Sequence, residues 1–201
     1  GVANQADDCA SKAGLIGMTR ALAMEMNVLC YDPFKPAKDF PDGVEVVRDL
    51  NRIFTESDYV SVHTPNTPLT HNMINKETLA MMKPTAFLIN TARGGCVDED
   101  ALYEACKDGT ICGAGLDAIK QEPVDPNFPL LSLDNVIIYP HIGGNTTEAA
   151  HRASYFAAMG VEEVYEGQKP TWPINDVDYA TAPTYTDTKK PDKKPAGMFE
   201  Y

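Results

Sequence analysis

Residues 86–109, AFLINTARGGCVDEDALYEACKDG, carry the clearest indication of the fold class. The apolar start of this stretch, residues 86–91, predicts a short strand buried on both faces. Asp98 then precedes the helical pattern 99–107 as a capping residue, and Gly109 follows it as a stop signal. A strand, a glycine-containing loop and a helix in this order are typical of an α/β fold.

The same pattern recurs on both sides of this stretch. Helices are predicted after Asp49 and after Asn75, and a longer one is predicted from Asn145 to Gly167, because N-T-T-E at its start places Glu148 three residues after a capping residue. The alternation predicts a mainly parallel sheet with helices on both faces. The other strands are expected at residues 27–32, 44–47, 59–64, 111–116 and 136–139.

The chain divides into three parts by composition. Residues 1–26 form an N-terminal helical segment, because 10–26 carry apolar residues along one helical face. Residues 27–174 hold the predicted sheet. Residues 175–201 are rich in Asp, Thr, Lys and Pro and are expected to be a mobile tail, whose lysines are either a contact patch or, as we prefer, part of a solvated terminus.

Composition excludes several classes of protein. The 201 residues are 43% hydrophobic and carry 17 basic against 29 acidic residues, a net charge of −12 that disfavours nucleic acid and anionic membranes as partners. The five cysteines include no C-x-x-C pair, so neither a disulfide framework nor a metal site is expected. No signal peptide and no membrane span is predicted, and we expect a cytoplasmic protein.

Polar residues directly after the predicted strands are the first candidates for a binding site, because ligands of open α/β sheets bind beyond the carboxyl ends of the strands. Asp32 ends one strand, where a carboxylate can accept hydrogen bonds from both ribose hydroxyls of an adenosine. It is equally well read as a turn residue before Pro33.

His141 is the best acid–base candidate, because imidazole titrates nearest to neutrality and this residue precedes Gly143 and Gly144 in a loop. Glu122 can orient an imidazole, and Arg93 can bind a substrate carboxylate in a planar fork. Each has a structural alternative: His141 can be a structural histidine, Glu122 a turn residue and Arg93 part of a surface ion pair.

Residues 27–174 resemble the nicotinamide-binding domain of the D-2-hydroxyacid dehydrogenases, a family that includes phosphoglycerate dehydrogenase and glyoxylate/hydroxypyruvate reductase. The resemblance lies in NVLCYDPF, DYVSVHTPNTPLTHNMIN, MKPTAFLINTARGGCVDEDAL, GAGLDAIKQEP and NVIIYPHIGGNT, in the order and spacing of the family. It implies a Rossmann-type fold, NAD as cofactor and a small 2-hydroxy or 2-oxo acid as substrate.

The resemblance also implies roles for individual residues. Arg93 would orient the substrate, His141 would exchange a proton with the substrate oxygen, and Glu122 would be the partner of His141. Asp32 would bind the adenine ribose and favour NAD over NADP, and Asp117 would contact the nicotinamide amide. The other residues expected to line the cofactor are Thr64, Pro65, Thr70, Thr91, Ala92 and Gly144.

Three features depart from the family pattern. No first strand and no G-x-G-x-x-G turn is recognised before residue 27, and no strand leads into Gly14 and Gly17. The chain has no room for the family's substrate domain. Residues 3–24 instead resemble the active-site helix of short-chain dehydrogenases, in which Lys12 matches but Asp8 stands in place of the tyrosine, so we infer no activity of that type.

These features predict a truncated NAD-dependent oxidoreductase that transfers a hydride to or from C2 of a small 2-hydroxy or 2-oxo acid with impaired efficiency. Two alternatives stay open. One is a non-catalytic remnant of such an enzyme. The other is an oligomerisation or binding module that forms a homodimer through residues 145–166 and 168–174.

Overall fold

The computed structural model describes residues 26–173. The helix expected at 10–26, except its last residue, and the tail expected at 175–201 lie outside these residues. The described chain belongs to two units, one that ends at Thr146 and contains all six strands, and one that contains helix α5 (Thr147–Tyr165). No helix within the described residues is long and apolar enough to cross a membrane.

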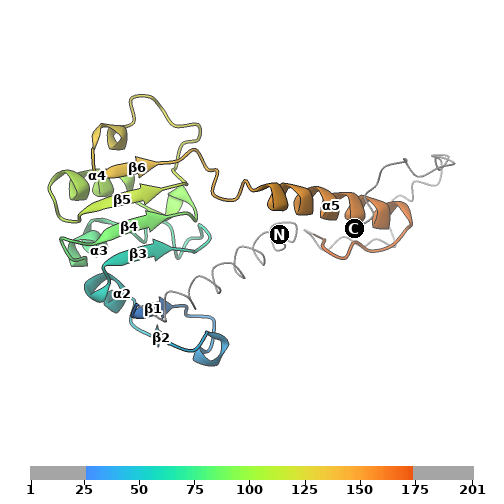
Figure 1. Cartoon of the computed structure of the whole chain (residues 1–201), viewed down its shortest axis with the longest axis horizontal. Helices are drawn as coiled ribbons and strands as arrows, with labels where there is room; N and C mark the ends of the chain where they lie inside the picture. Colours follow the sequence, from blue (N-terminus) through green and yellow to red (C-terminus); the bar gives the residue numbers. More distant parts are fainter. Residues whose placement is uncertain (1–25, 174–201) are drawn as a thin grey trace. The chain divides into compact units, whose positions relative to one another are not determined.

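All six predicted strands are present in the described residues. The strands are β1 (Val28–Tyr31), β2 (Val44–Val47), β3 (Tyr59–Val62), β4 (Phe87–Asn90), β5 (Gly113–Leu116) and β6 (Val136–Ile138). Every pairing is parallel, and the strands form two sheets with the orders β1-β2 and β3-β4-β5-β6 (Figure 1). Among the described residues, no strand stands between β1 and β3 to join the two sheets by backbone hydrogen bonds.

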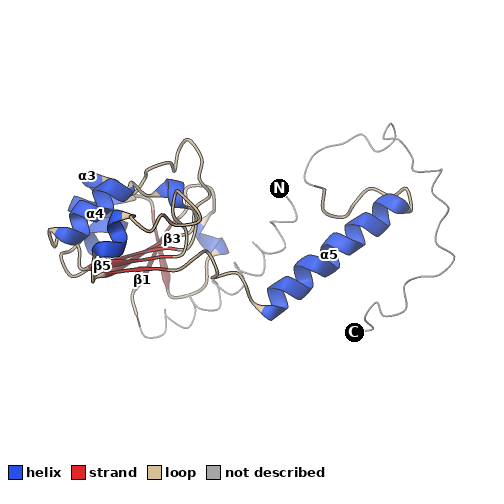
Figure 2. Ribbon diagram, turned by 90° about the horizontal axis from the view of Figure 1, so that it is seen from above, coloured by secondary structure: helices blue, strands red, loops and turns tan. Residues whose placement is uncertain are grey.

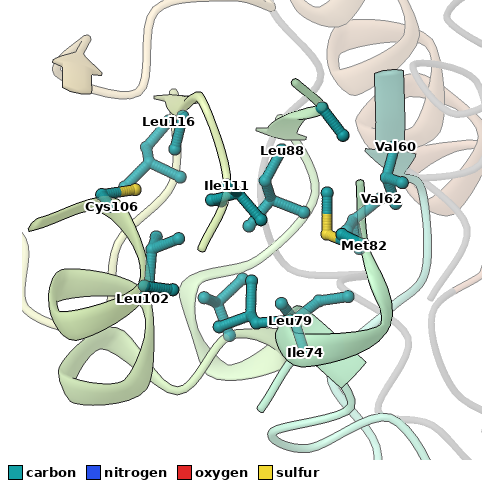
Figure 3. Packing of buried hydrophobic residues seen from close by; sticks show 14 of the residues in the cluster. Val60, Val62, Ile74, Leu79, Met82, Leu88, Leu102, Cys106, Ile111 and Leu116 are labelled. Atoms are coloured by element: carbon teal, nitrogen blue, oxygen red, sulfur yellow. The ribbon is translucent and has the colours of Figure 1, made fainter. Parts of the chain in front are cut away.

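The core lies between the larger sheet and the helices α2 (Asn51–Glu56), α3 (Lys76–Met81) and α4 (Glu99–Lys107). Figure 2 shows α3 and α4 on one face of the sheet. Strand register places Val60, Leu88, Ala114 and Val136 in one row across the sheet. Val60 and Leu88 pack on the apolar side chains of the helices (Figure 3). Each is buried and contributes about 2 kcal/mol. Ala114 is buried in the same cluster, and Val136 is half-buried against it. The helix side of this core includes Leu79 and Leu102.

The opposite face of the larger sheet is open among the described residues. Tyr59 stacks on Phe87 there with ring centroids 5.8 Å apart, and the side chains of Tyr59 and Ile137 are 59% and 61% exposed. The expected helices on both faces are therefore observed on one face in this part of the chain.

Helix boundaries follow the predicted caps with small differences. Asn75 forms a capping box with Thr78 at the start of α3, and Asp98 accepts a hydrogen bond from the Ala101 amide in α4. Helix α2 begins two residues after Asp49, whose Oδ1 accepts from the Asn51 amide, so Asp49 forms a local turn rather than the helix cap. Helix α5 begins at Thr147, two residues after Asn145.

Candidate active site

The candidate site lies where β4, β5 and β6 end. Because these strands are parallel, their carboxyl ends share one edge of the sheet, and the loops that follow them start side by side. The first loop carries Arg93, the second carries Asp117 and Glu122, and the third carries His141.

The structure brings His141 and Glu122 together. Nδ1 of His141 lies 2.8 Å from Oε2 of Glu122, although the two residues are 19 positions apart. The His141 backbone has a positive φ of 55°, which turns the loop at this residue. The carboxylate accepts a hydrogen bond from Nδ1–H, and Nε2 faces no hydrogen-bond partner among the described residues.

Glu122 is held from two sides. Its second oxygen, Oε1, accepts a hydrogen bond from the Ile119 amide at 3.2 Å. The hydrogen bond from His141 lowers the pKa of the Glu122 carboxyl, and the Ile119 amide lowers it further, whereas partial burial and the nearby Asp117 carboxylate oppose the shift. Glu122 is therefore ionised at neutral pH and oriented toward the imidazole.

Arg93 lies in an exposed position in the loop after β4. One of its guanidinium nitrogens, Nη1, donates to the Ala92 carbonyl oxygen at 2.7 Å, which leaves further N–H groups for a ligand. The next residue, Gly94, packs so closely on the second loop that an added Cβ would lie 2.0 Å from the Ile119 carbonyl carbon. Only glycine fits there, and the close contact presses the Arg93 loop against the loop of Glu122.

Asp117 binds the backbone of the third loop. Its Oδ1 accepts from the Ile142 amide and its Oδ2 accepts from the Gly143 amide, each at 2.9 Å. This carboxylate therefore fixes the two residues that follow His141. A carboxylate has about four acceptor positions, and two of them are used here, so Asp117 can still accept a hydrogen bond from a nicotinamide amide. That contact stays a prediction.

Asp32 follows β1, and its side chain stabilises a turn, which is one of the two roles that the sequence suggested for it. Its Oδ1 accepts hydrogen bonds from the amides of Phe34 and Lys35, at 2.8 and 3.2 Å. Among the described residues Oδ2 has no hydrogen-bond partner. The turn and the ribose readings are therefore compatible, because one oxygen shapes the turn and the other can accept from a hydroxyl.

The remaining predicted cofactor residues lie in the loops after β3, β4 and β6. Thr64 is half-buried beside Cys96, and the Thr70 hydroxyl donates to the carbonyl oxygen of Pro65. Thr91 is exposed and Ala92 half-buried next to Arg93. Gly144 lies in open space, with no atom within 4 Å of the position that a Cβ would take.

Sequence reasoning missed one residue of this edge. Asn90 at the end of β4 is fully buried, and its side chain makes hydrogen bonds to the loops after both β4 and β5. The only signal in the sequence is a single amide at the end of the apolar run 86–90.

These groups fit the adenosine ribose and the nicotinamide end of a dinucleotide. The observations that carry this fit are Oδ2 of Asp32 and Nε2 of His141, which have no hydrogen-bond partner within residues 26–173, and the open space at Gly144. A glycine-rich turn for the pyrophosphate would precede β1, outside the described residues.

Comparison with known proteins agrees with this geometry. Residues 11–143 match the family model described as "D-isomer specific 2-hydroxyacid dehydrogenase, NAD binding domain". The match begins upstream of residue 27 and so includes the segment with Gly14 and Gly17.

Two curated relatives and one solved structure illustrate the similarity. The chain is 49% identical over 135 residues to a hydroxypyruvate reductase of Thermotoga maritima, covering 66% of this chain and 43% of the relative. It is 44% identical over 150 residues to a D-3-phosphoglycerate dehydrogenase of Methanocaldococcus jannaschii, covering 74% of this chain and 28% of the relative.

The solved structure is a D-lactate dehydrogenase of Aquifex aeolicus complexed with NAD and lactic acid. The similarity has a TM-score of 0.67 at 36% identity and covers 74% of this chain and 49% of that chain. The chain thus spans less than half the length of each of these three proteins. Through this NAD-binding domain, the chain belongs to the D-isomer-specific 2-hydroxyacid dehydrogenase family.

Proposed function

We propose that this chain binds NAD(H) along the carboxyl edge of its strands and supplies the acid–base part of a 2-hydroxyacid dehydrogenase. The reaction is hydride transfer between the nicotinamide and C2 of a small 2-hydroxy or 2-oxo acid. The observation that carries the proposal is the 2.8 Å hydrogen bond between Nδ1 of His141 and the Glu122 carboxylate, which leaves Nε2 for the substrate.

His141 moves the proton in both directions of the reaction. In the reduction, the imidazolium donates the Nε2 proton to the oxygen at C2 of the oxo acid while that carbon receives the hydride. In the oxidation, neutral His141 accepts the hydroxyl proton at Nε2 while the hydride leaves C2. Glu122 keeps the Nδ1 proton in place and stabilises the imidazolium.

Arg93 binds the substrate carboxylate. The guanidinium is planar and offers parallel N–H donors, so it holds a carboxylate in a fixed orientation. Its loop is fixed by Gly94 against the loop of Glu122, which keeps the carboxylate-binding group and the acid–base pair at a constant separation.

Asp32 binds the hydroxyls of the adenine ribose through Oδ2. The residues that would hold the rest of the cofactor are Thr64, Pro65, Thr70, Thr91, Ala92, Asp117 and Gly144. Asp32 also repels the additional phosphate of NADP, so we propose NAD as the preferred cofactor.

Two measurements test this function. NADH fluorescence with the purified chain tests binding, and assays with NADH and glyoxylate, hydroxypyruvate or pyruvate test turnover. We expect weak NADH binding and slow turnover, because the chain spans 28% and 43% of the two curated relatives compared above. A hybrid that joins this domain to the substrate domain of the Thermotoga relative provides the stronger assay.

In the hybrid, His141→Ala is expected to lower kcat by about a hundredfold or more while NADH binding stays within about twofold. His151→Ala is the matched control, because His151 is an exposed histidine of α5. Equal turnover of the His141→Ala and His151→Ala hybrids would contradict the proposed role of His141.

A second function, as a homodimeric interaction module, is favoured by one observation. Helix α5 carries large apolar side chains that are exposed in the described residues, with Tyr155 60% and Val161 72% exposed. Light scattering of the purified chain tests this, with a dimer mass expected and a monomer mass at high protein concentration arguing against it.

For the location of the protein we propose the cytoplasm, since Cys30, Cys96, Cys106 and Cys112 are free thiols.

A further inference from the structure

Asn90 occupies an unusual place in the sheet. Strand register puts it in one row with Val62, Leu116 and Ile138, on the face that packs against the helices. Its exposed fraction is 0%, and it is the one polar residue in the core of the described chain. A buried amide in an apolar row is costly unless all its polar atoms are hydrogen-bonded.

The Asn90 side chain is satisfied by two different loops. Nδ2 donates to the carbonyl oxygen of Arg93 at 3.1 Å and to that of Ala118 at 3.2 Å. Oδ1 accepts from the Ala92 amide at 3.1 Å. One side chain therefore joins the backbone of Arg93 in the first loop to the second loop, directly after Asp117.

The hydrogen bonds continue from this point to His141. The residue after Ala118 is Ile119, whose amide donates to Oε1 of Glu122 at 3.2 Å. The other oxygen of Glu122 accepts from Nδ1 of His141 at 2.8 Å. Gly94 packs on the backbone of Ile119, so the two loops also touch beside these bonds.

We propose that Asn90 is a positioning residue that holds the backbone of Arg93 in register with the Glu122–His141 pair. It acts from the core and does not touch the substrate. Its importance for catalysis rests on the proposed function, whereas the coupling itself is a property of the folded chain. A buried amide suits this task, because its donors and acceptor have fixed directions and packing prevents the side chain from turning.

The chain contains a matched control at the other edge of the sheet. Asn135 is half-buried immediately before β6, and its Nδ2 also donates to two backbone carbonyl oxygens, those of Cys106 and Cys112, at 3.0 and 2.9 Å. It therefore makes similar bonds at the end of the sheet where the strands begin.

The first experiment compares Asn90→Ala with Asn135→Ala in the full chain, after thermal melts have shown cooperative unfolding. The measured quantity is the pKa of Glu122, which is obtained from a pH titration of the NMR signal of its side-chain carboxyl carbon. Loss of the Asn90 bonds frees Ala118 and Ile119, so the pKa of Glu122 is expected to rise toward its ordinary value in Asn90→Ala alone. An unchanged pKa in folded Asn90→Ala, or an equal rise in both variants, would overturn the proposal.

The second experiment changes Glu122, at the partly exposed end of the hydrogen-bonded connection from Asn90 to His141. It stays informative if Asn90→Ala does not fold. Glu122→Gln changes a side chain that is 38% exposed, and NMR follows the side-chain amide protons of Asn90 and Asn135. The Asn90 signals are expected to shift and to exchange faster, while those of Asn135 stay in place. Unchanged Asn90 signals would overturn the coupling. Neither readout involves NADH or turnover, so a failure of the proposed function would appear separately in the enzyme assays.

Discussion

The two sheets of the molecule differ in how they hold their functional residues. The sheet β3–β6 is backed by α3 and α4 and contributes most of the buried core, including Leu88, and its loops are joined to one another by Asn90 and Asp117. The pair β1–β2 contributes one buried residue, Val47, to the described core, and Asp32 is held by a local turn. We therefore expect the proposed acid–base half of the site to be held more firmly than the proposed ribose half, which depends on a local turn.

The largest expected difference concerns stability. Leu88→Ala in β4 removes a fully buried side chain and should lower the free energy of unfolding by about 2–5 kcal/mol. Leu29→Ala in β1 removes a half-buried side chain and should cost about 1 kcal/mol or less. Denaturant unfolding measures both, with the 84% exposed Leu69→Ala as control. Equal losses for Leu88→Ala and Leu29→Ala would remove the distinction between the sheets.

Thiol labelling compares the same two regions without substitutions. Burial raises the pKa of the Cys106 thiol to about 11, which reduces its reactive thiolate roughly a hundredfold relative to an ordinary cysteine. Cys112 is exposed and should react first, and Cys30 in β1 should react at an intermediate rate because it is only half-buried. Mass spectrometry of labelled peptides gives the three rates. A Cys30 as slow as Cys106 would show that β1 is as tightly held as the core.

The smallest of these effects concerns cofactor choice. Asp32→Ala removes the charge that opposes the additional phosphate of NADP, so the preference for NADH over NADPH should shrink by about tenfold, or ~1.4 kcal/mol. Asp39→Ala, at an exposed neighbouring carboxylate, should leave the preference unchanged. Fluorescence titrations with both cofactors decide this. If the unmodified chain bound both cofactors equally, the ribose role of Asp32 would be wrong.

The sequence predicted the strands well because each one is a short apolar run between polar turns. The pairing of Glu122 with His141 was implied by the resemblance to the D-2-hydroxyacid dehydrogenases, and the two side chains form a hydrogen bond of 2.8 Å in the structure. Asn90 could not be predicted, because an amide at a strand end looks the same in sequence whether it faces solvent or the core. The contacts of Gly94 and Asp117 depend on how three loops meet in space, which the local pattern does not record.

An NADH titration followed at the backbone amides by NMR shows whether NAD(H) binds along the carboxyl edge of the strands. We expect chemical shift changes in the loops that carry Asp32, Ala92 and Gly144, with the amides of Tyr59 and Asn135 at the opposite edge unchanged. Shifts confined to the edge where the strands begin, or no shift at millimolar NADH, would contradict it.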